Sequence, residues 1–88
     1  MCVCYILYSE ERGRFYIGHT CDEMSERLRK HNSNHKGFTG RVEDWQLVYQ
    51  EQFSSKEEAL HRELEIKKWK SRKRILALIE NYKLDQEL

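Results

Sequence analysis

The chain has 88 residues, of which 39% are hydrophobic and 35% are charged. This length allows one small domain with a single modest core and no separate recognition domain, and the composition is typical of a soluble globular protein rather than a disordered or fibrous one. The apolar start is too short to span a bilayer, and it lacks a basic leader and a cleavage site. We therefore expect a cytoplasmic protein with no membrane partner.

Charge is balanced over the whole chain but not along it. The formal net charge is +1, from 16 Lys and Arg against 15 Asp and Glu, so the total does not indicate a nucleic-acid partner. Residues 67–74 (KKWKSRKR) concentrate positive charge around Trp69, whereas residues 22–26 and the C-terminal end carry acid. The basic run predicts either a solvated helix face or a phosphate-binding patch. In such a patch Trp69 either stacks on an exposed base or packs at the helix edge.

Three cysteines, Cys2, Cys4 and Cys21, are an odd number, which argues against a disulfide framework and favours a reducing compartment. We expect their side chains to lie inside the protein as small apolar groups. The same cysteines with His19 are an alternative zinc site, although a single C-x-C without a second paired spacing is a weak zinc signal.

Two apolar runs at the start of the chain predict a β-hairpin. Residues 1–8 (MCVCYILY) and 15–20 (FYIGHT) are rich in aromatic and β-branched residues, and a short polar segment with one glycine separates them. The first run is almost wholly apolar, which predicts a central strand covered on both faces. Tyr5 and Tyr16 then carry hydroxyl groups into a buried region, where they need partners. Gly18 is expected to allow a close approach of the backbone.

A helix is predicted over residues 22–32, because residues 20–23 (TCDE) have the pattern of a capping box. Residues three and four apart share one face of a helix, so the pattern points one stripe of side chains toward the body of the protein. An inward histidine and arginine are either a core histidine beside a snorkelling arginine or a functional pair. A polar loop is expected over residues 32–40. The inward stripe of this helix consists of Met24, Leu28 and His31, and Arg27 flanks it.

A third strand is predicted over residues 45–53 (WQLVYQEQF), which are rich in aromatic and branched residues and partly alternate. Strict alternation would place Trp45, Leu47 and Tyr49 on one face. Ser54 and Ser55 then mark the start of another helix, expected to end near residue 70.

Glu63 falls near the centre of the apolar arc of this second helix. Burying an ionised carboxylate costs several kcal/mol unless the group is paired or bound to a cation. Glu63 is therefore predicted either to form a structural ion pair, with Arg27 or with the neighbours of Arg62, or to be a metal-binding or catalytic group. The arc consists of Ala59, Leu60, Leu64 and Ile66.

Ser71 is expected to cap a last helix over residues 72–82, and residues 83–88 are expected to form a loose tail. The apolar face of this helix consists of Ile75, Leu76, Leu78 and Ile79.

These residues resemble the signature of the GIY-YIG nucleases. Val3-Cys4-Tyr5 stands where the family has Gly-Ile-Tyr, so only the tyrosine of that triplet is kept, whereas Tyr16-Ile17-Gly18 is intact. The helix Arg27-Leu-Arg-Lys-His31 resembles the Arg-x-x-x-His helix of the family, and Ala59-Leu-His-Arg-Glu63 resembles the segment that carries its single acidic residue. The resemblance covers residues 3–79, nearly the whole chain.

The resemblance implies an α/β (α+β) GIY-YIG fold, in which a three-stranded antiparallel sheet is flanked by about three helices. Residues 1–82 would form the single nuclease domain. The chain is similar to the small catalytic module of bacterial excision-repair nucleases. The implied activity is that of a metal-dependent endonuclease that hydrolyses phosphodiester bonds in DNA, in DNA repair or recombination.

The resemblance also implies a role for each residue of the site. Tyr5 takes the proton of the attacking water, His31 helps to deprotonate Tyr5, and Tyr16 positions these groups by hydrogen bonding. The role of base requires the pKa of Tyr5 to fall from about 10. Arg27 clamps the scissile phosphate with two donors. Glu63 holds one divalent cation, Mg²⁺ or alternatively Mn²⁺.

Basic side chains near the predicted site are expected to contact the nucleic acid. The sequence leaves open DNA or RNA, the preferred substrate structure, the oligomeric state, and whether a partner protein or subunit supplies specificity. Two other interpretations also stay open: a nucleic-acid-binding module with the nuclease fold and little activity alone, and a small zinc-binding interaction domain. The predicted nucleic-acid contacts are Arg41, Lys67, Lys70, Arg72 and Lys73.

Overall fold

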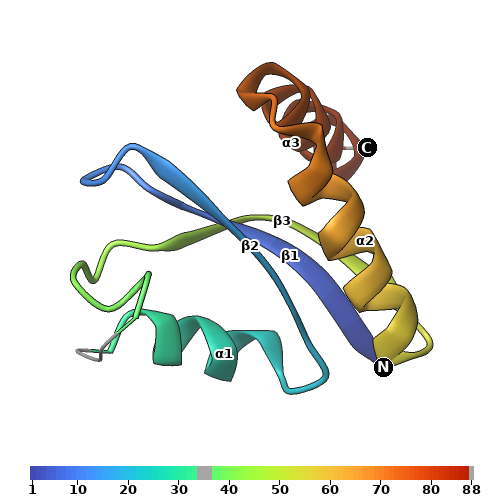
Figure 1. The fold of residues 1–88 in the computed structure, drawn as a ribbon, viewed down its shortest axis with the longest axis horizontal. Coiled ribbons are helices and arrows are strands. Elements are labelled where there is room, and N and C mark those ends of the chain that lie inside the picture. Colours follow the sequence, from blue (N-terminus) through green and yellow to red (C-terminus); the bar gives the residue numbers. More distant parts are fainter. Residues whose placement is uncertain (34–36, 88) are drawn as a thin grey trace.

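The computed structural model describes residues 1–33 and 37–87. These described residues form three strands and three helices, arranged as an α+β fold (Figure 1). The predicted residues 34–36 of the polar loop and Leu88 of the tail lie outside the described residues. The elements in chain order are β1 (Cys2–Ser9), β2 (Arg14–Thr20), α1 (Met24–His31), β3 (Gln46–Phe53), α2 (Lys56–Trp69) and α3 (Arg72–Glu87).

The three strands form an antiparallel sheet with the order β2-β1-β3, which confirms the hairpin and the central position of β1. In the hairpin, Tyr5 lies opposite Gly18 and Leu7 lies opposite Tyr16. Gly13 closes the turn with a φ of 62°, a backbone conformation that glycine adopts without steric cost. The register therefore brings both tyrosines and Gly18 to neighbouring positions on one face.

Strand β3 contains a β-bulge, so the prediction that Trp45, Leu47 and Tyr49 share one face of the sheet is wrong. Ile6 pairs with Tyr49, but the next residue of β1, Leu7, pairs with Leu47, so Val48 has no partner of its own. The extra residue shifts the alternation of side chains. Leu47 therefore packs on the Tyr5 side of the sheet, as Trp45 does, whereas Tyr49 packs on the opposite side with Cys4.

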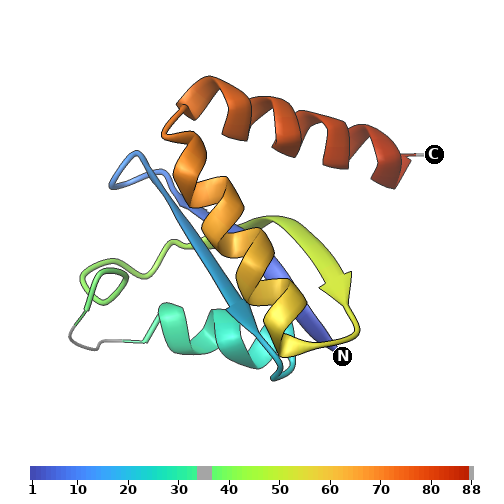
Figure 2. The same ribbon diagram turned by 45° about the vertical axis from the view of Figure 1, so that its right-hand side comes forward.

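Helices cover both faces of the sheet (Figures 1 and 2). Helix α1 lies against the face that carries Tyr5 and Leu7, where Met24 and Leu28 pack beside Val42 and Trp45. Helices α2 and α3 lie on the opposite face. The core there is built from Cys4, Ile6, Tyr49, Ile66 and Ile79. Two apolar clusters thus lie on the two faces of a sheet whose central strand is buried.

The helix starts differ in how well the sequence predicted them. Helix α1 begins at Met24 rather than near residue 22, because the Thr20 hydroxyl accepts a hydrogen bond from the backbone N–H of Asp22 in the preceding turn and no side chain caps the helix. The other two predicted caps are confirmed: the hydroxyl of Ser55 accepts from Glu58 N–H, and that of Ser71 accepts from Arg74 N–H.

Helix α3 continues to Glu87, so the loose tail predicted for residues 83–88 is wrong for the described residues. On α2, Ala59 and Ile66 are buried as expected, but Leu60 and Leu64 are exposed. The sheet that α2 covers is only three strands wide, so it buries a narrower part of the helix surface than the apolar residues of α2 occupy. Leu76 of α3 is also exposed.

The structure contains a disulfide between Cys2 and Cys21, contrary to the expectation from the odd number of cysteines. The hairpin register explains it: Val3 pairs with Thr20, so the next positions outward are Cys2 and Cys21. An odd count excludes complete pairing but not a single bridge. Cys4 remains a free, buried thiol, and the cysteines no longer argue for a reducing compartment.

None of the helices in the described parts of the chain has the length and apolar character that crossing a membrane requires.

Candidate active site

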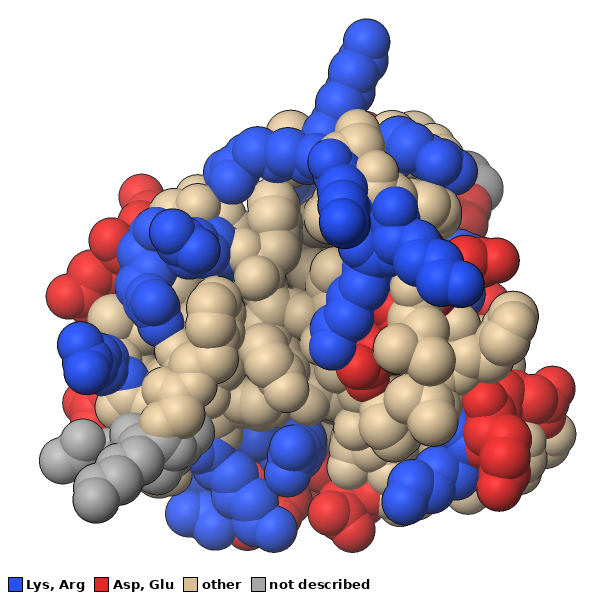
Figure 3. Space-filling view, viewed as in Figure 1, with Lys and Arg blue, Asp and Glu red and all other residues tan. Residues whose placement is uncertain are grey.

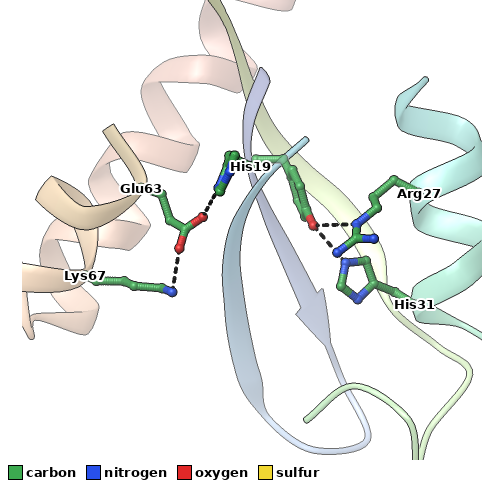
Figure 4. Close-up of polar contacts among 6 residues, drawn as sticks. His19, Arg27, His31, Glu63 and Lys67 are labelled. Atoms are coloured by element: carbon green, nitrogen blue, oxygen red, sulfur yellow. Dashed lines mark hydrogen bonds and ion pairs between the residues drawn. The ribbon is translucent and has the colours of Figure 1, made fainter. Parts of the chain in front are cut away.

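The centre of the site is Tyr5, whose side chain is fully buried on β1. Its hydroxyl lies 2.8 Å from Nε2 of His31 and accepts a hydrogen bond of 3.4 Å from Nε of Arg27. Arg27 and His31 are four residues apart on α1, so one helix face presents both groups to the strand. The structure thus brings together three of the predicted residues, and Figure 4 shows Arg27 and His31 side by side.

The loop before β3 fixes His31 from its other side. Nδ1 of His31 lies 2.9 Å from the hydroxyl of Thr39, and the indole N–H of Trp45 donates to the Thr39 carbonyl at 3.0 Å. The backbone of Trp45 is in turn held by the amide of Asn32, which follows α1. Because both ring nitrogens of His31 are engaged, the orientation of the ring is defined by its neighbours.

Gly18 is needed where it lies because its strand passes directly beside the tyrosines. A β-carbon built at Gly18 would lie 2.8 Å from the Tyr5 hydroxyl and 3.0 Å from a ring carbon of Tyr16. Contacts this short require the rings to move. The predicted close approach of the backbone is therefore an approach to Tyr5 and Tyr16.

The ionisation of Tyr5 differs from what the base role requires. Burial raises the pKa of Tyr5 to about 12, and the hydrogen bond from Arg27 only partly opposes this rise. At neutral pH the phenol keeps its proton, so in this structure it can donate to His31 while it accepts from Arg27. The arrangement makes Tyr5 a link between these two side chains.

Tyr16, in contrast, faces an open pocket. The cavity has a volume of about 390 Å³, which lies in the lower part of the range of roughly 300–1,000 Å³ for ligand pockets. The Tyr16 ring centroid is 4.7 Å from that of His31. The lining residues are Tyr16, Arg27, Lys30, His31, Ser33, Phe38 and Thr39.

Glu63 lies on the opposite face of the sheet from these residues, as Figure 4 shows. Adjacent strand residues point to opposite faces, so His19 on β2 points away from Tyr5 and toward α2. Nδ1 of His19 lies 2.6 Å from Oε1 of Glu63, and Nζ of Lys67 donates to Oε2 at 2.6 Å. The ion pair with Arg27 considered from the sequence is replaced by these two contacts.

The electrostatic environment keeps Glu63 ionised. Only 8% of the residue is exposed, and burial by itself raises the pKa of the carboxyl. The contacts with Lys67 and His19 outweigh that effect and lower the pKa below its ordinary value of 4.5. The charge of Glu63 also raises the pKa of Tyr5, so the two faces of the site are within electrostatic range of each other.

The donor chemistry at Glu63 fits a single hard cation. Mg²⁺ is commonly held by one or two carboxylates, with waters and substrate phosphates completing its shell. Glu63 supplies one ionised carboxylate, and the Lys67 side chain on it is half exposed and able to move away. Among the described residues no three His, Cys, Asp or Glu side chains converge on a common metal site. Cys2 and Cys21 of the alternative zinc site form the disulfide.

A second cavity, of about 360 Å³, lies at the end of β2 and is lined by residues from both sides of the sheet. Arg27 lines this cavity as well as the first one, and His19, the partner of Glu63, lines its other side. Arg27 therefore lies between the Tyr16 pocket and the face of the sheet on which Glu63 lies. The lining residues are His19, Thr20, Cys21, Asp22, Arg27 and Lys56.

Positive side chains gather where α2 meets α3, at the top of the view in Figure 3. Lys67 lies in the last turn of α2, Lys70 follows that helix, and Lys73 lies in the first turn of α3. The side chain of Arg72 already has contacts within the protein, because it donates a hydrogen bond to the Gly13 carbonyl and lies over the ring of Phe15. Arg41 is elsewhere, beside a cavity that Glu11, Glu43 and Asp44 also line. The structure therefore groups four of the five predicted nucleic-acid contacts and separates Arg41 from them.

Trp69 packs at the edge of the α2–α3 core. The guanidinium groups of Arg74 and Arg62 lie 4.3 and 5.6 Å from the centroid of its ring. Of the two arrangements that the sequence left open for Trp69, this is the one in which the ring packs at the helix edge.

Three residues of the site were missed from the sequence. His19 was considered only as a zinc ligand, although its position next to Gly18 places it on the opposite face of β2, toward the inward carboxylate. Thr39 and Phe38 lie in a loop without periodic pattern, so no sequence signal indicated their contacts with His31 and Tyr16.

Comparison with known proteins gives two matches. The family model described as the GIY-YIG catalytic domain matches residues 1–75. The chain is 39% identical over 69 residues to UPF0213 protein SSP2268 of Staphylococcus saprophyticus subsp. saprophyticus, a match that covers 77% of this chain and 83% of that protein. No solved structure matches the chain.

Proposed function

Because this chain belongs to the GIY-YIG family of catalytic domains, we propose that it is a divalent-metal-dependent endonuclease that hydrolyses phosphodiester bonds in DNA, in repair or recombination. Membership of the family supports a nuclease-type function. The observation that carries the proposal is the position of Arg27, which hydrogen-bonds Tyr5 and lines both the Tyr16 pocket and the cavity beside His19.

Arg27 is the group proposed to bind the scissile phosphate. A guanidinium offers two parallel donors to phosphate oxygens, and hydrolysis accumulates negative charge on these same oxygens as the attacking water approaches. Tyr5 accepts from Nε of Arg27, which leaves the terminal nitrogens for the substrate. Tyr5 and His31 thereby orient the guanidinium toward the cavities.

The two tyrosines are proposed to have different roles. Tyr16 lines the pocket and can meet a water molecule beside the phosphate, with His31 next to it. Tyr5 is fully buried, and burial raises its pKa to about 12. We therefore assign the handling of the water proton to Tyr16, against which the His31 ring packs, and the positioning role to Tyr5, the reverse of the assignment that the family resemblance implied.

Glu63 is the residue proposed to hold the divalent cation, either Mg²⁺ or Mn²⁺. When bound, the cation would neutralise charge on the phosphoryl oxygens and the leaving oxygen. Lys67 has to leave the carboxylate for this, and its released ammonium group then adds positive charge beside the substrate. His19 holds the other carboxylate oxygen and orients it.

The test is a cleavage assay with Mg²⁺ or Mn²⁺ on supercoiled plasmid, single-stranded, flapped and branched DNA, and RNA. Glu63→Gln should lower the cleavage rate by about 100-fold or more without loss of nucleic-acid binding in EDTA. Tyr16→Phe should lower the rate more than Tyr5→Phe does. Glu57→Gln, an exposed carboxylate on the same helix, is the matched control and should cleave at the wild-type rate.

The second candidate is a nucleic-acid-binding module that keeps the fold and cleaves little alone. The specific observation in its favour is that both oxygens of Glu63 already have protein partners, as in a structural ion pair. Folded wild-type protein that binds nucleic acid but cleaves none of the substrates would support this candidate. A Glu63→Gln variant that fails to fold would assign Glu63 a structural role.

A further inference from the structure

Phe38 presents an exposed aromatic ring at the pocket beside Tyr16. The residue is 47% exposed, and its ring centroid lies 6.0 Å from that of Tyr16 and 6.2 Å from that of Trp45. Arg12 holds it in place, since its guanidinium lies 4.7 Å from the ring centroid and also donates to the Phe38 carbonyl. The ring is thus fixed at the rim of a cavity without being part of the core.

The same pocket also carries positive charge. Arg27 and Lys30 line it together with His31, and the described residues around it include no acidic side chain. A planar apolar surface next to positive charge matches the two parts of a nucleotide, namely the face of a base and its phosphate. Stacking on an aromatic side chain is available to every base, because each base has a π-face.

Resting on the proposed nuclease function, we infer that this pocket is a nucleotide subsite next to the scissile phosphate. The base of the nucleotide that flanks the cut leaves its stack and lies against Phe38, and its phosphate contacts Lys30. Arg27, which lines the pocket, holds the adjoining scissile phosphate. A base that remains stacked in a helix has no exposed face to offer, so the subsite requires an unstacked nucleotide. DNA and RNA share this chemistry.

The experiment measures binding in EDTA, so that the substrate stays intact. Labelled single-stranded DNA and RNA oligonucleotides of one sequence are prepared intact and with an abasic site at each position in turn. Fluorescence anisotropy is measured with wild-type protein, Phe38→Ala, Phe38→Tyr and Leu84→Ala. The last variant is the matched control, because Leu84 is 52% exposed on α3. Thermal unfolding of each variant checks that the fold is kept.

Phe38→Ala should weaken binding of the intact oligonucleotide by about 5- to 100-fold, whereas Phe38→Tyr and Leu84→Ala should bind like the wild type. At one position, the abasic site should weaken wild-type binding by a similar factor and should cost Phe38→Ala nothing further. Comparison of the DNA and RNA series shows which sugar the subsite accepts.

Three outcomes would overturn the subsite: unchanged binding by Phe38→Ala, a loss that is the same with an abasic site at every position, or no binding of any oligonucleotide by folded wild-type protein. The nuclease proposal is decided separately by adding Mg²⁺ or Mn²⁺. Phe38-dependent binding without cleavage would keep the pocket as a nucleotide-binding site and refute the nuclease. Cleavage together with binding that does not depend on Phe38 would support the nuclease and refute the subsite.

Discussion

Replacement of Gly18 by Ala tests the geometry on which the whole site depends. The added β-carbon would lie 2.8 Å from the hydroxyl oxygen of Tyr5 and 2.9 Å from the ring carbon that carries it. Tyr5 is fully buried and cannot swing into solvent. Gly18→Ala should therefore push the Tyr5 ring away from β2 and lengthen its 2.8 Å contact with His31.

The expected cost follows from two effects. Overpacking a well-packed core costs typically about 1–3 kcal/mol, and weakening a buried hydrogen bond costs about 1–3 kcal/mol when a partner is left unsatisfied. Alanine regains about 0.5–1 kcal/mol relative to glycine in a strand, because the unfolded chain has less freedom to lose. At the middle of these ranges the free energy of unfolding should thus fall by about 3 kcal/mol, which for a domain of this size lowers Tm by about 12–24 °C.

Urea and thermal unfolding of purified protein measure this loss. Gly13→Ala is the matched control, since a β-carbon there meets nothing within 4 Å and the cost comes only from its φ of 62°, about 1–2 kcal/mol. Gly18→Ala combined with Tyr5→Phe, which removes the nearest atom, should cost less than the sum of the two single changes. The reasoning fails if Gly18→Ala destabilises the protein no more than Gly13→Ala does.

Two further predictions concern the basic region and the disulfide. Lys70→Gln with Lys73→Gln should weaken single-stranded DNA binding and reduce the slope of log K against log salt by about 0.7 for each phosphate that the protein no longer neutralises; an unchanged slope in a salt titration would place the interface elsewhere. Removal of the Cys2–Cys21 bridge, which closes a separation of 19 residues, should lower the free energy of unfolding by about 3 kcal/mol. Thiol titration of denatured protein should find one free thiol, from Cys4, before reduction and three after it; three before reduction would exclude the bridge.

The sequence predicted burial correctly at several positions where a local pattern dictates it, although Leu60, Leu64 and Leu76 on the predicted apolar faces are exposed. An uninterrupted apolar run predicted the central strand correctly, because only a strand covered on both faces tolerates it. The inward positions of Glu63 and His31 followed from helical periodicity alone, and both residues are buried. Tyr49 was assigned to the wrong face because a bulge at Val48 changes the register, and no feature of the composition marks a bulge.

Contacts between distant segments could not be predicted in the same way. The pairing of His19 with Glu63 joins residues 44 apart in sequence and depends on how α2 crosses the edge strand. Thr39 and Phe38 reach the site through a loop whose course is set by the packing of Trp45. The division of the site between two faces of the sheet is likewise a tertiary property, since the order of residues along the chain is the same for either arrangement.

Lys70, the C-cap residue of α2, is a position where stability and the proposed function favour different residues. Its φ of 47° lies in the left-handed region, where a residue with a β-carbon costs roughly 1–2 kcal/mol more than glycine. Glycine at this position would make the protein more stable, yet it would remove one of the positive charges proposed to contact the substrate. The change that stabilises the protein is therefore also expected to weaken the proposed binding of nucleic acid, and such a conflict between stability and function is common at functional positions.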